Sequence, residues 1–336
     1  MNAMSPSDIA TDELSRHIAS HDAAAAHDLV QRLLGTGWSI AELVTDLLAS
    51  TQRRIGQEWQ AGRCTIAEEH AASAVVEDLL GSLARLVPPP RSRATVALVC
   101  AEGEWHVTPA RMAALLLRQA GWRTAFLGGS TPIGHLERSL GALRPDFVAI
   151  SCTDPRFLLG AGRVADLARR LELPSIAGGA GFGDGDTRAR ALGITGWAPD
   201  AASASAMLHR WQELPLPEPS ATSVPRGQLD PPDRRHSAVT EQAIQRLAAS
   251  VPTVLPHGAQ PLEDVRRDLG ELLHVAHVAA VCRDPGLLEG FVRWLADVRP
   301  PRGLPHEAVE PSVRILRELT DRFDDGSTEV LATVAD

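Results

Sequence analysis

The sequence predicts a multi-domain protein of the α and α/β classes, and three observations support this. The 336 residues are enough for two or three domains. Apolar residues recur at helical spacing near both ends of the chain, whereas short apolar strands alternate with helical segments in the middle. Segments rich in proline separate these parts. We therefore expect a helical bundle in 1–90, a doubly wound α/β domain in 91–213, a Pro-rich linker in 214–236 and an all-α domain in 237–336.

Two capping boxes mark helix starts in the first domain. Ser39 with Glu42, and Thr65 with Glu68, place a hydroxyl residue three positions before a carboxylate and just ahead of an apolar, periodic segment. Apolar residues in 12–34 also recur at helical spacing. Four short helices of this kind predict an antiparallel bundle.

The second domain is predicted from five apolar strands, each followed by a polar or glycine-rich junction. Fully apolar strands are typical of a parallel sheet that is covered on both faces. Thr-Pro or Asp-Pro pairs at Thr108, Thr131 and Asp154 predict helix starts after the first three strands. The pattern predicts a flavodoxin-like fold, whose ligands bind at the carboxyl ends of the strands. The strands are expected in 94–100, 123–128, 146–151, 174–179 and 194–198.

The last domain is expected to be helical around one central helix. Residues 261–284 form a long periodic segment whose second half is apolar nearly all round, which predicts burial on more than one side. Asp284 then precedes a proline and is expected to cap the next helix.

Composition excludes several classes of protein. The net charge of −9 argues against nucleic acid as a large-area ligand. The four cysteines are scattered, so neither a disulfide framework nor a zinc site is indicated. There is no long apolar run and no signal-peptide pattern, so we expect a cytoplasmic protein without membrane contact.

Residues 101–109 read AEGEWHVTP, and His106 stands just past the first strand. This loop resembles the DxHxxG motif of cobalamin-binding corrinoid proteins. Ser151 and Thr153 occupy the family's Ser-x-Leu position, and Gly178-Gly179 its Gly-Gly position. The resemblance covers residues 94–213. Pro109 stands where the motif has glycine, and Thr153 where it has leucine.

The resemblance implies that His106 ligates cobalt from below in place of the cofactor's own dimethylbenzimidazole. It also implies that Glu104, at the position of the motif's Asp, orients that histidine. Ser151 and Thr153 would line the slot for the displaced nucleotide tail, which Gly178 and Gly179 would let the backbone approach. The further cofactor-binding positions are Val107, Gly128 and Gly129.

The bundle carries a second signature. Trp59, Glu69 and His70 match the Trp, nine residues, Glu-His pattern of the CarH-like light-sensing cobalamin proteins. The resemblance implies an aromatic wall at Trp59 for an upper adenosyl group and a ribose acceptor at Glu69. His70 would pair nearby or approach the cobalt. Gln60 replaces the family's light-state histidine ligand, which leaves the residue that ligates cobalt after illumination open.

The domain order resembles that of photocobilins, in which a C-terminal helical domain binds biliverdin close to the cobalamin. Histidines and a cysteine on the central helix, together with arginines that suit propionates, are the candidate bilin-binding residues. They are His274, His277, Cys282, Arg266, Arg267 and Arg293. The alternative is that the histidines are buried interface residues and the arginines solvated. For Trp59 the alternative is a core residue at a helix end. For Glu69 and His70 the alternative is the solvated start of a helix.

These resemblances imply a photoreceptor rather than an enzyme. Light would break the cobalt–carbon bond of adenosylcobalamin, move the bundle and change a light-dependent homo-oligomer or the binding of a signalling partner. Direct DNA binding is not expected, because no DNA-binding domain precedes the bundle. The alternatives are a corrinoid carrier for methyl transfer and a scaffold that has lost its cofactor. A mutase is disfavoured, because the sequence predicts no barrel domain.

Overall fold

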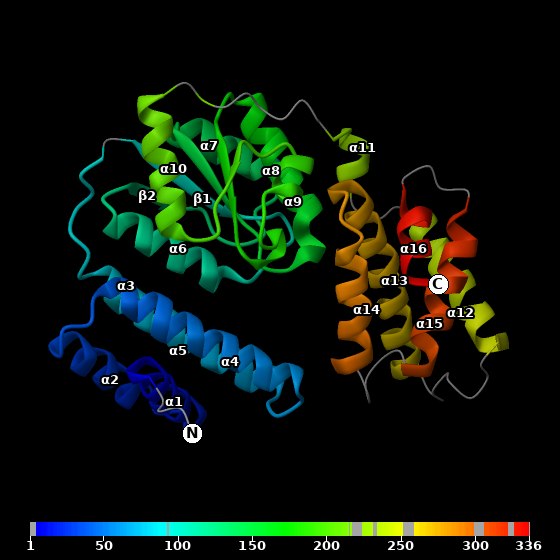
Figure 1. Ribbon diagram of the computed structural model, residues 1–336, viewed down its shortest axis with the longest axis horizontal. Helices are drawn as coiled ribbons and strands as arrows, with labels where there is room; N and C mark the ends of the chain where they lie inside the picture. The colour runs from blue at the N-terminus through cyan, green and yellow to red at the C-terminus, as the bar shows by residue number, and fades with distance from the viewer. Residues whose placement is uncertain are drawn as a thin grey trace.

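The computed structural model describes residues 5–92, 94–214, 216, 224–230, 234–250, 259–298, 306–321 and 326–335. Figure 1 shows three bodies. The N-terminal helices lie beneath an α/β domain, and the C-terminal helices stand beside it. The predicted fold class is confirmed: a five-stranded parallel sheet lies between two helical regions.

The N-terminal body is a bundle of four helical rods. The third rod is continuous from α3 through a π-helical stretch into α4. Both predicted capping boxes are present at Ser39 and Thr65, and a third at Ser5 was not predicted. The rods are α1 (Pro6–Ala19), α2 (Ala23–Gly35), α3 (Ile40–Glu42) with Leu43–Leu48 and α4 (Ala49–Gln60), and α5 (Ile66–Ala84).

All five predicted strands are present, and they pair in the order β2-β1-β3-β4-β5. This is the flavodoxin-like order. The ends of the central strands are aligned, because Ser151 lies opposite both Cys100 and Gly178. The strands are β1 (Thr95–Cys100), β2 (Arg123–Phe126), β3 (Phe147–Ser151), β4 (Ser175–Gly178) and β5 (Gly196–Trp197).

Helices cover both faces of the sheet. Side chains of α6 (Val107–Gln119) and α10 (Ala201–Glu213) fill the core of one face, and those of α7 (Ile133–Leu143) and α8 (Leu158–Arg170) that of the other. The described chain also has the short α9 (Thr187–Ala191) and the 3-10 turns η2 (Pro155–Phe157) and η3 (Ala180–Phe182).

Two of the three predicted helix starts are wrong in detail. His106 is the N-cap residue of α6, and the Thr108 hydroxyl donates to Glu77 instead of capping. In α7 the N-cap is Pro132, and the Thr131 hydroxyl donates to the Leu127 carbonyl. The third start is confirmed, because the Asp154 carboxylate accepts from the Arg156 amide.

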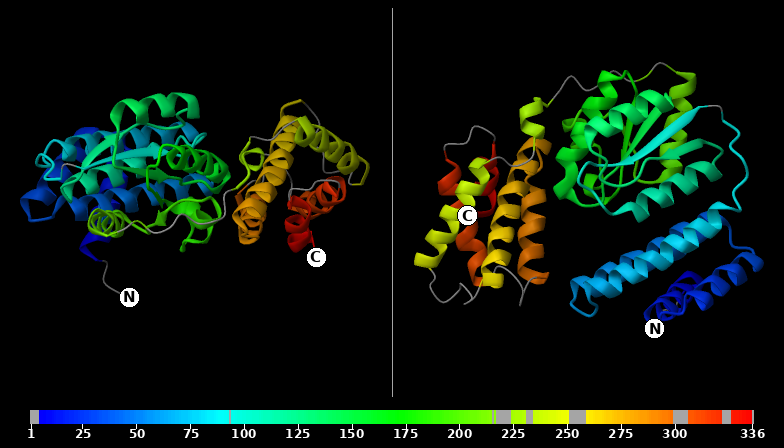
Figure 2. Two further views of the ribbon diagram at one scale, coloured as in Figure 1. Left: turned by 90° about the horizontal axis from the view of Figure 1, so that it is seen from above. Right: turned by 180° about the vertical axis from the view of Figure 1, so that it is seen from behind.

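The C-terminal body surrounds α13, as predicted. Its apolar core is continuous with the α7–α8 side of the sheet domain, and Leu229 bridges the two at Gly162. Figure 2 shows α13 and α14 nearest the sheet domain. The helices are α11 (Arg226–Leu229), α12 (Arg234–Ser250), α13 (Ala259–Cys282), α14 (Gly286–Val298), α15 (His306–Thr320) and α16 (Ser327–Ala335). Within the described ranges, no helix is long and apolar enough to cross a membrane.

Candidate functional site

Glu104 joins the loop after β1 to the loop after β3. Its side chain is 0% exposed. One carboxylate oxygen accepts hydrogen bonds from Nδ1 and the backbone N–H of His106, the latter at 3.0 Å. The other oxygen accepts from the backbone N–H groups of Thr153 at 3.0 Å and Asp154 at 2.9 Å. One buried carboxylate therefore fixes both the ring of His106 and the path of the second loop.

The two members of this pair shift each other's pKa. Burial alone would raise the pKa of Glu104, but the hydrogen bonds from His106 and from the Asp154 amide outweigh it and lower that pKa. The hydrogen bond to Glu104 raises the pKa of His106 despite partial burial, and the charges of Asp154 and Glu69 add to the effect. Glu69 of the bundle is thus within electrostatic reach of His106.

His106 opens into a cavity of about 480 Å³ between the three bodies. Trp59 and Gln60, at the end of α4, supply its bundle side. Thr153 and Arg156, beside β3, supply part of the sheet-domain side. The C-terminal domain contributes Val275, Gly286, Leu287, Gly290, Phe291 and Trp294. Trp59 and His106 therefore line one space, whereas Glu69 and His70 are not among its lining residues.

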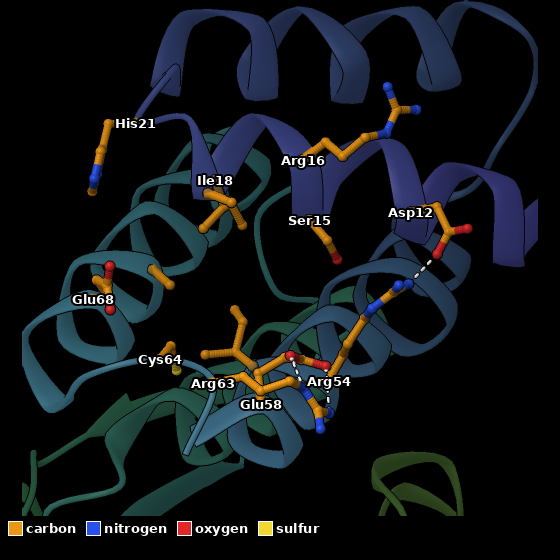
Figure 3. Close-up of a pocket in the computed structure, with 13 residues that line it drawn as sticks. Asp12, Ser15, Arg16, Ile18, His21, Arg54, Glu58, Arg63, Cys64 and Glu68 are labelled. Atoms are coloured by element: carbon orange, nitrogen blue, oxygen red, sulfur yellow. Dashed lines mark hydrogen bonds and ion pairs between the residues drawn. The ribbon is translucent and has the colours of Figure 1, made fainter. Parts of the chain in front are cut away.

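The turn that carries Trp59 is braced by an ion pair. Arg63 donates to Glu58 through Nε at 2.6 Å and through its terminal nitrogen at 2.9 Å. Figure 3 shows this pair beside a second cavity of about 500 Å³, within the bundle, where Arg54 also pairs with Asp12. Beyond the turn, Glu69 accepts from the Ser73 hydroxyl, and the His70 side chain is exposed.

Two glycines at the strand ends allow neighbouring segments of the chain to pack closely, because a Cβ at these positions would clash. A Cβ at Gly129 would lie 2.7 Å from a methyl group of Val107, and one at Gly179 would lie 2.4 Å from the Cys152 carbonyl oxygen. The backbone at Gly179 is therefore packed closely against the loop that follows β3. Gly178 and the buried Ser151 end β4 and β3 at the same edge, and Gly128 has a positive φ of 86°.

Comparison with known families identifies the two N-terminal bodies. One family, described as a B12 binding domain, matches residues 10–84, and a second with the same description matches residues 94–206. Both N-terminal bodies thus match a B12 binding domain over most of their length. Cobalamin is therefore the ligand for which the His106 cavity must be tested.

Two curated relatives are transcriptional repressors of Myxococcus xanthus. The chain is 39% identical over 111 residues to "HTH-type transcriptional repressor CarH", and the match covers 33% of this chain and 37% of that protein. It is 30% identical over 121 residues to "HTH-type transcriptional repressor CarA", covering 35% and 42%. The chain thus spans less than half the length of the curated relatives it matches.

Among solved structures, the Methanosarcina barkeri monomethylamine corrinoid protein shares the fold. It is 17% identical, with a TM-score of 0.52, and the match covers 60% of this chain and 97% of that one. At this low identity, the similarity supports only the fold, which is a helical bundle next to a sheet domain. It gives no information about the substrate of this chain.

The residues of the cavity fit cobalamin. The His106 side chain is 57% exposed, and Nδ1 is taken by Glu104, which leaves Nε2 as the metal-ligating nitrogen. The described residues contain no cluster of three or more potential ligands for a bare metal ion. A lone imidazole suits a cobalt whose equatorial ligands come from a macrocycle. The Thr153 hydroxyl is buried without a hydrogen-bond partner, and Thr153 is one of the residues that line the same space.

The residues proposed for a bilin are not among those that line this cavity. His274 lies 2.8 Å from the Arg156 carbonyl oxygen, at the interface with the sheet domain. His277 lies 2.9 Å from the carbonyl oxygen of Gln228 in α11, within the C-terminal body. Arg266 pairs with Glu241 and Glu263, and Arg267 pairs with Asp264. Arg293 is exposed, and burial raises the pKa of the Cys282 thiol to about 12.

Sequence reasoning missed three features of the site. Arg156 and Arg188 line the cavity, although no cobalamin motif includes them. The cavity-facing side of α14 was not predicted either. Trp105 is 73% exposed beside His106, and only its place in the motif loop gave a signal.

Proposed function

We propose that this protein is a light sensor that holds adenosylcobalamin between its bundle and its sheet domain. The observation that carries the proposal is the placement of Trp59 and the Glu104-bound His106 on one cavity. The match to two B12-binding domains and the partial similarity to the CarH and CarA repressors support it.

In the proposed state His106 ligates the cobalt through Nε2, while Glu104 holds the Nδ1–H proton and keeps the ring upright. Residues at the carboxyl edge of β3 and β4, Thr153 among them, would hold the nucleotide tail. Ser151 and Gly178 end the two strands at this edge.

Trp59 forms the wall for the upper ligand, and Glu69 accepts from the ribose hydroxyls after a small closure of the α4–α5 turn. When bound, adenosylcobalamin supplies a cobalt–carbon bond that visible light breaks. The bundle then loses the contacts that favoured its closed position, so its position and an association equilibrium shift. The proposed output is a light-dependent homo-oligomer or a signalling partner.

We also propose biliverdin as a second chromophore of the C-terminal domain, on the strength of the domain order. Binding there requires the arginine side chains of α13 to exchange their present carboxylate partners for propionates. A bilin absorption band in a variant that lacks His106 would test this part independently of cobalamin.

A corrinoid carrier for methyl transfer is the second candidate. The observation that favours it is that Glu69 and His70 are not among the residues that line the cavity, so this side of the site would be open to a methyl donor. A carrier needs such access, whereas a sensor needs the turn to close over the adenosyl group.

One experiment separates the candidates. The full chain is loaded with adenosylcobalamin in the dark, illuminated with visible light, and followed by absorption spectroscopy and size-exclusion chromatography, with His106→Ala as the control. A sensor binds in the dark and changes both spectrum and elution in light. Binding without a light response contradicts the sensor and leads to methyl-transfer assays. No binding contradicts both candidates.

A further inference from the structure

One face of α14 lines the cavity that His106 and Trp59 share. Gly286 and Gly290 are four residues apart, as are Leu287 and Phe291, and Trp294 follows one turn later. Residues at these spacings lie on one side of a helix. The C-terminal domain therefore presents a defined strip of side chains to the site.

The strip is a recess with an aromatic border. The rings of Phe291 and Trp294 stack with centroids 5.5 Å apart and planes 22° apart. A Cβ built at Gly290 would meet no atom within 4 Å, so the backbone there faces open space. A flat ligand edge can approach this surface closely, with the two rings beside it.

The start of α14 is fixed to the sheet domain. Asp284 accepts from the Gly286 amide at 3.1 Å and pairs with Arg188 at 2.8 Å. Arg188 also donates to the carbonyl oxygen of Gly181, in the turn that follows β4, at 2.9 Å. The strip therefore stands at a set position relative to the strand ends that bear the cobalamin motifs.

We propose that this strip is the third wall of the cobalamin pocket and contacts the edge of the corrin ring. The proposal rests on the function proposed above. A cavity of about 480 Å³ is the size of a site for one ligand. A macrocycle placed over His106 and beside Trp59 fills it and must touch the remaining side, which is α14. The C-terminal domain is then part of the cofactor site and senses the cofactor directly.

The test places a large side chain at a position of the strip that has none. Gly290→Phe projects a ring into the cavity and, because phenylalanine is a better helix former than glycine, it does not weaken α14. Its control is Gly141→Phe in α7, a second exposed helical glycine with open space at its Cβ and no place in the cavity. The dissociation constant for adenosylcobalamin is measured in the dark by spectral titration, with the thermal unfolding midpoint of each apo variant.

The proposal predicts that Gly290→Phe raises the dissociation constant about tenfold or more, while Gly141→Phe leaves it within about twofold of the wild type. Phe291→Ala, which removes contact area instead of adding it, also weakens binding. Equal affinity in all three variants overturns the proposal while leaving the proposed function intact. If Gly290→Phe loses a biliverdin absorption band but keeps its affinity for cobalamin, the proposal is also overturned. Failure of the wild type to bind cobalamin refutes the proposed function instead.

Discussion

Arg156 lies 2.9 Å from Glu271 and is both a lining residue of the His106 cavity and an anchor of α13. The same guanidinium pairs with Asp154 at 2.6 Å, and the Asp154 amide donates to Glu104, the partner of His106. A continuous set of polar contacts therefore connects His106 to the central helix of the C-terminal domain.

Glu271→Gln is expected to loosen the C-terminal domain from the sheet domain. The variant keeps the size of the side chain but replaces the ion pair by a hydrogen bond from the charged Arg156 to a neutral amide oxygen, at a cost of about 1.5 kcal/mol in docking free energy. Hydrogen exchange at the amides of α13 should become faster. Cobalamin should still bind, because the contacts among Asp154, Glu104 and His106 persist.

The control for this variant is Glu263→Gln on the same helix. Glu263 pairs with Arg266 at 2.5 Å, but its side chain is 62% exposed, and exposed pairs contribute little. Exchange in α13 should match that of the wild type. If both variants accelerate exchange equally, the Arg156–Glu271 pair is not what holds the domain.

Acidification should weaken the same interface through His274. Burial lowers the pKa of His274 below its ordinary value near 6.5, and the positive charges of His277, His236 and Arg156 add to this, although the bond to the Arg156 carbonyl opposes it. The folded protein thus favours the neutral ring. The resulting stability is present above about pH 6.5 and is lost as the pH falls through the lowered pKa.

The measurement is the thermal unfolding midpoint between about pH 7.5 and pH 5 for the wild type and for His274→Gln. Glutamine can donate to the Arg156 carbonyl oxygen but does not titrate. We expect the midpoint of the wild type to fall more steeply with acid than that of the variant. Parallel pH profiles would rule out His274 as the source.

Removing the axial ligand should change the cobalamin spectrum as well as the affinity. His106→Ala leaves no imidazole for the lower face, so the histidine-ligated spectrum should be absent. Glu104→Gln keeps His106 but weakens its orientation, which typically costs about 10-fold to 100-fold in metal affinity. Both effects are read from spectral titrations with hydroxocobalamin.

Glu102→Gln is the matched control, because Glu102 lies in the same loop but bonds to Arg163 and the Ile133 amide rather than to His106. Its affinity should stay close to that of the wild type. A histidine-ligated spectrum that survives His106→Ala would mean that another residue ligates the cobalt.

Local signals in the sequence were sufficient for the elements and for the centre of the site. The capping boxes at Ser39 and Thr65 are fixed by residues three positions apart, and the apolar strands by burial between two layers of helices. The sequence could predict that His106 and Thr153 lie close together, because each follows a parallel strand and the carboxyl ends of these strands meet at one edge of the sheet.

Contacts between domains could not be predicted in this way. His274 meets the Arg156 carbonyl across 118 residues of chain, and nothing in the pattern of either segment names the other. A histidine on a buried helix can bind a ligand or form a hydrogen bond at an interface, so both interpretations of His274 stayed open in the sequence. The position of α14 on the cavity depends on this same docking.

Gly179→Ala is expected to destabilise the sheet domain without touching the proposed cobalt ligand. Gly179 has φ 103° and ψ 159°, a region that is essentially restricted to glycine, and an added Cβ would lie 2.4 Å from the Cys152 carbonyl oxygen. Strain and the clash together should cost about 3 kcal/mol, measured by urea unfolding. Gly141→Ala, inside α7 with open space at its Cβ, should instead gain about 0.5–1 kcal/mol. If Gly179→Ala is as stable as the wild type, the loop after β4 tolerates another path, and the Gly178-Gly179 pair is retained for the ligand rather than for the fold.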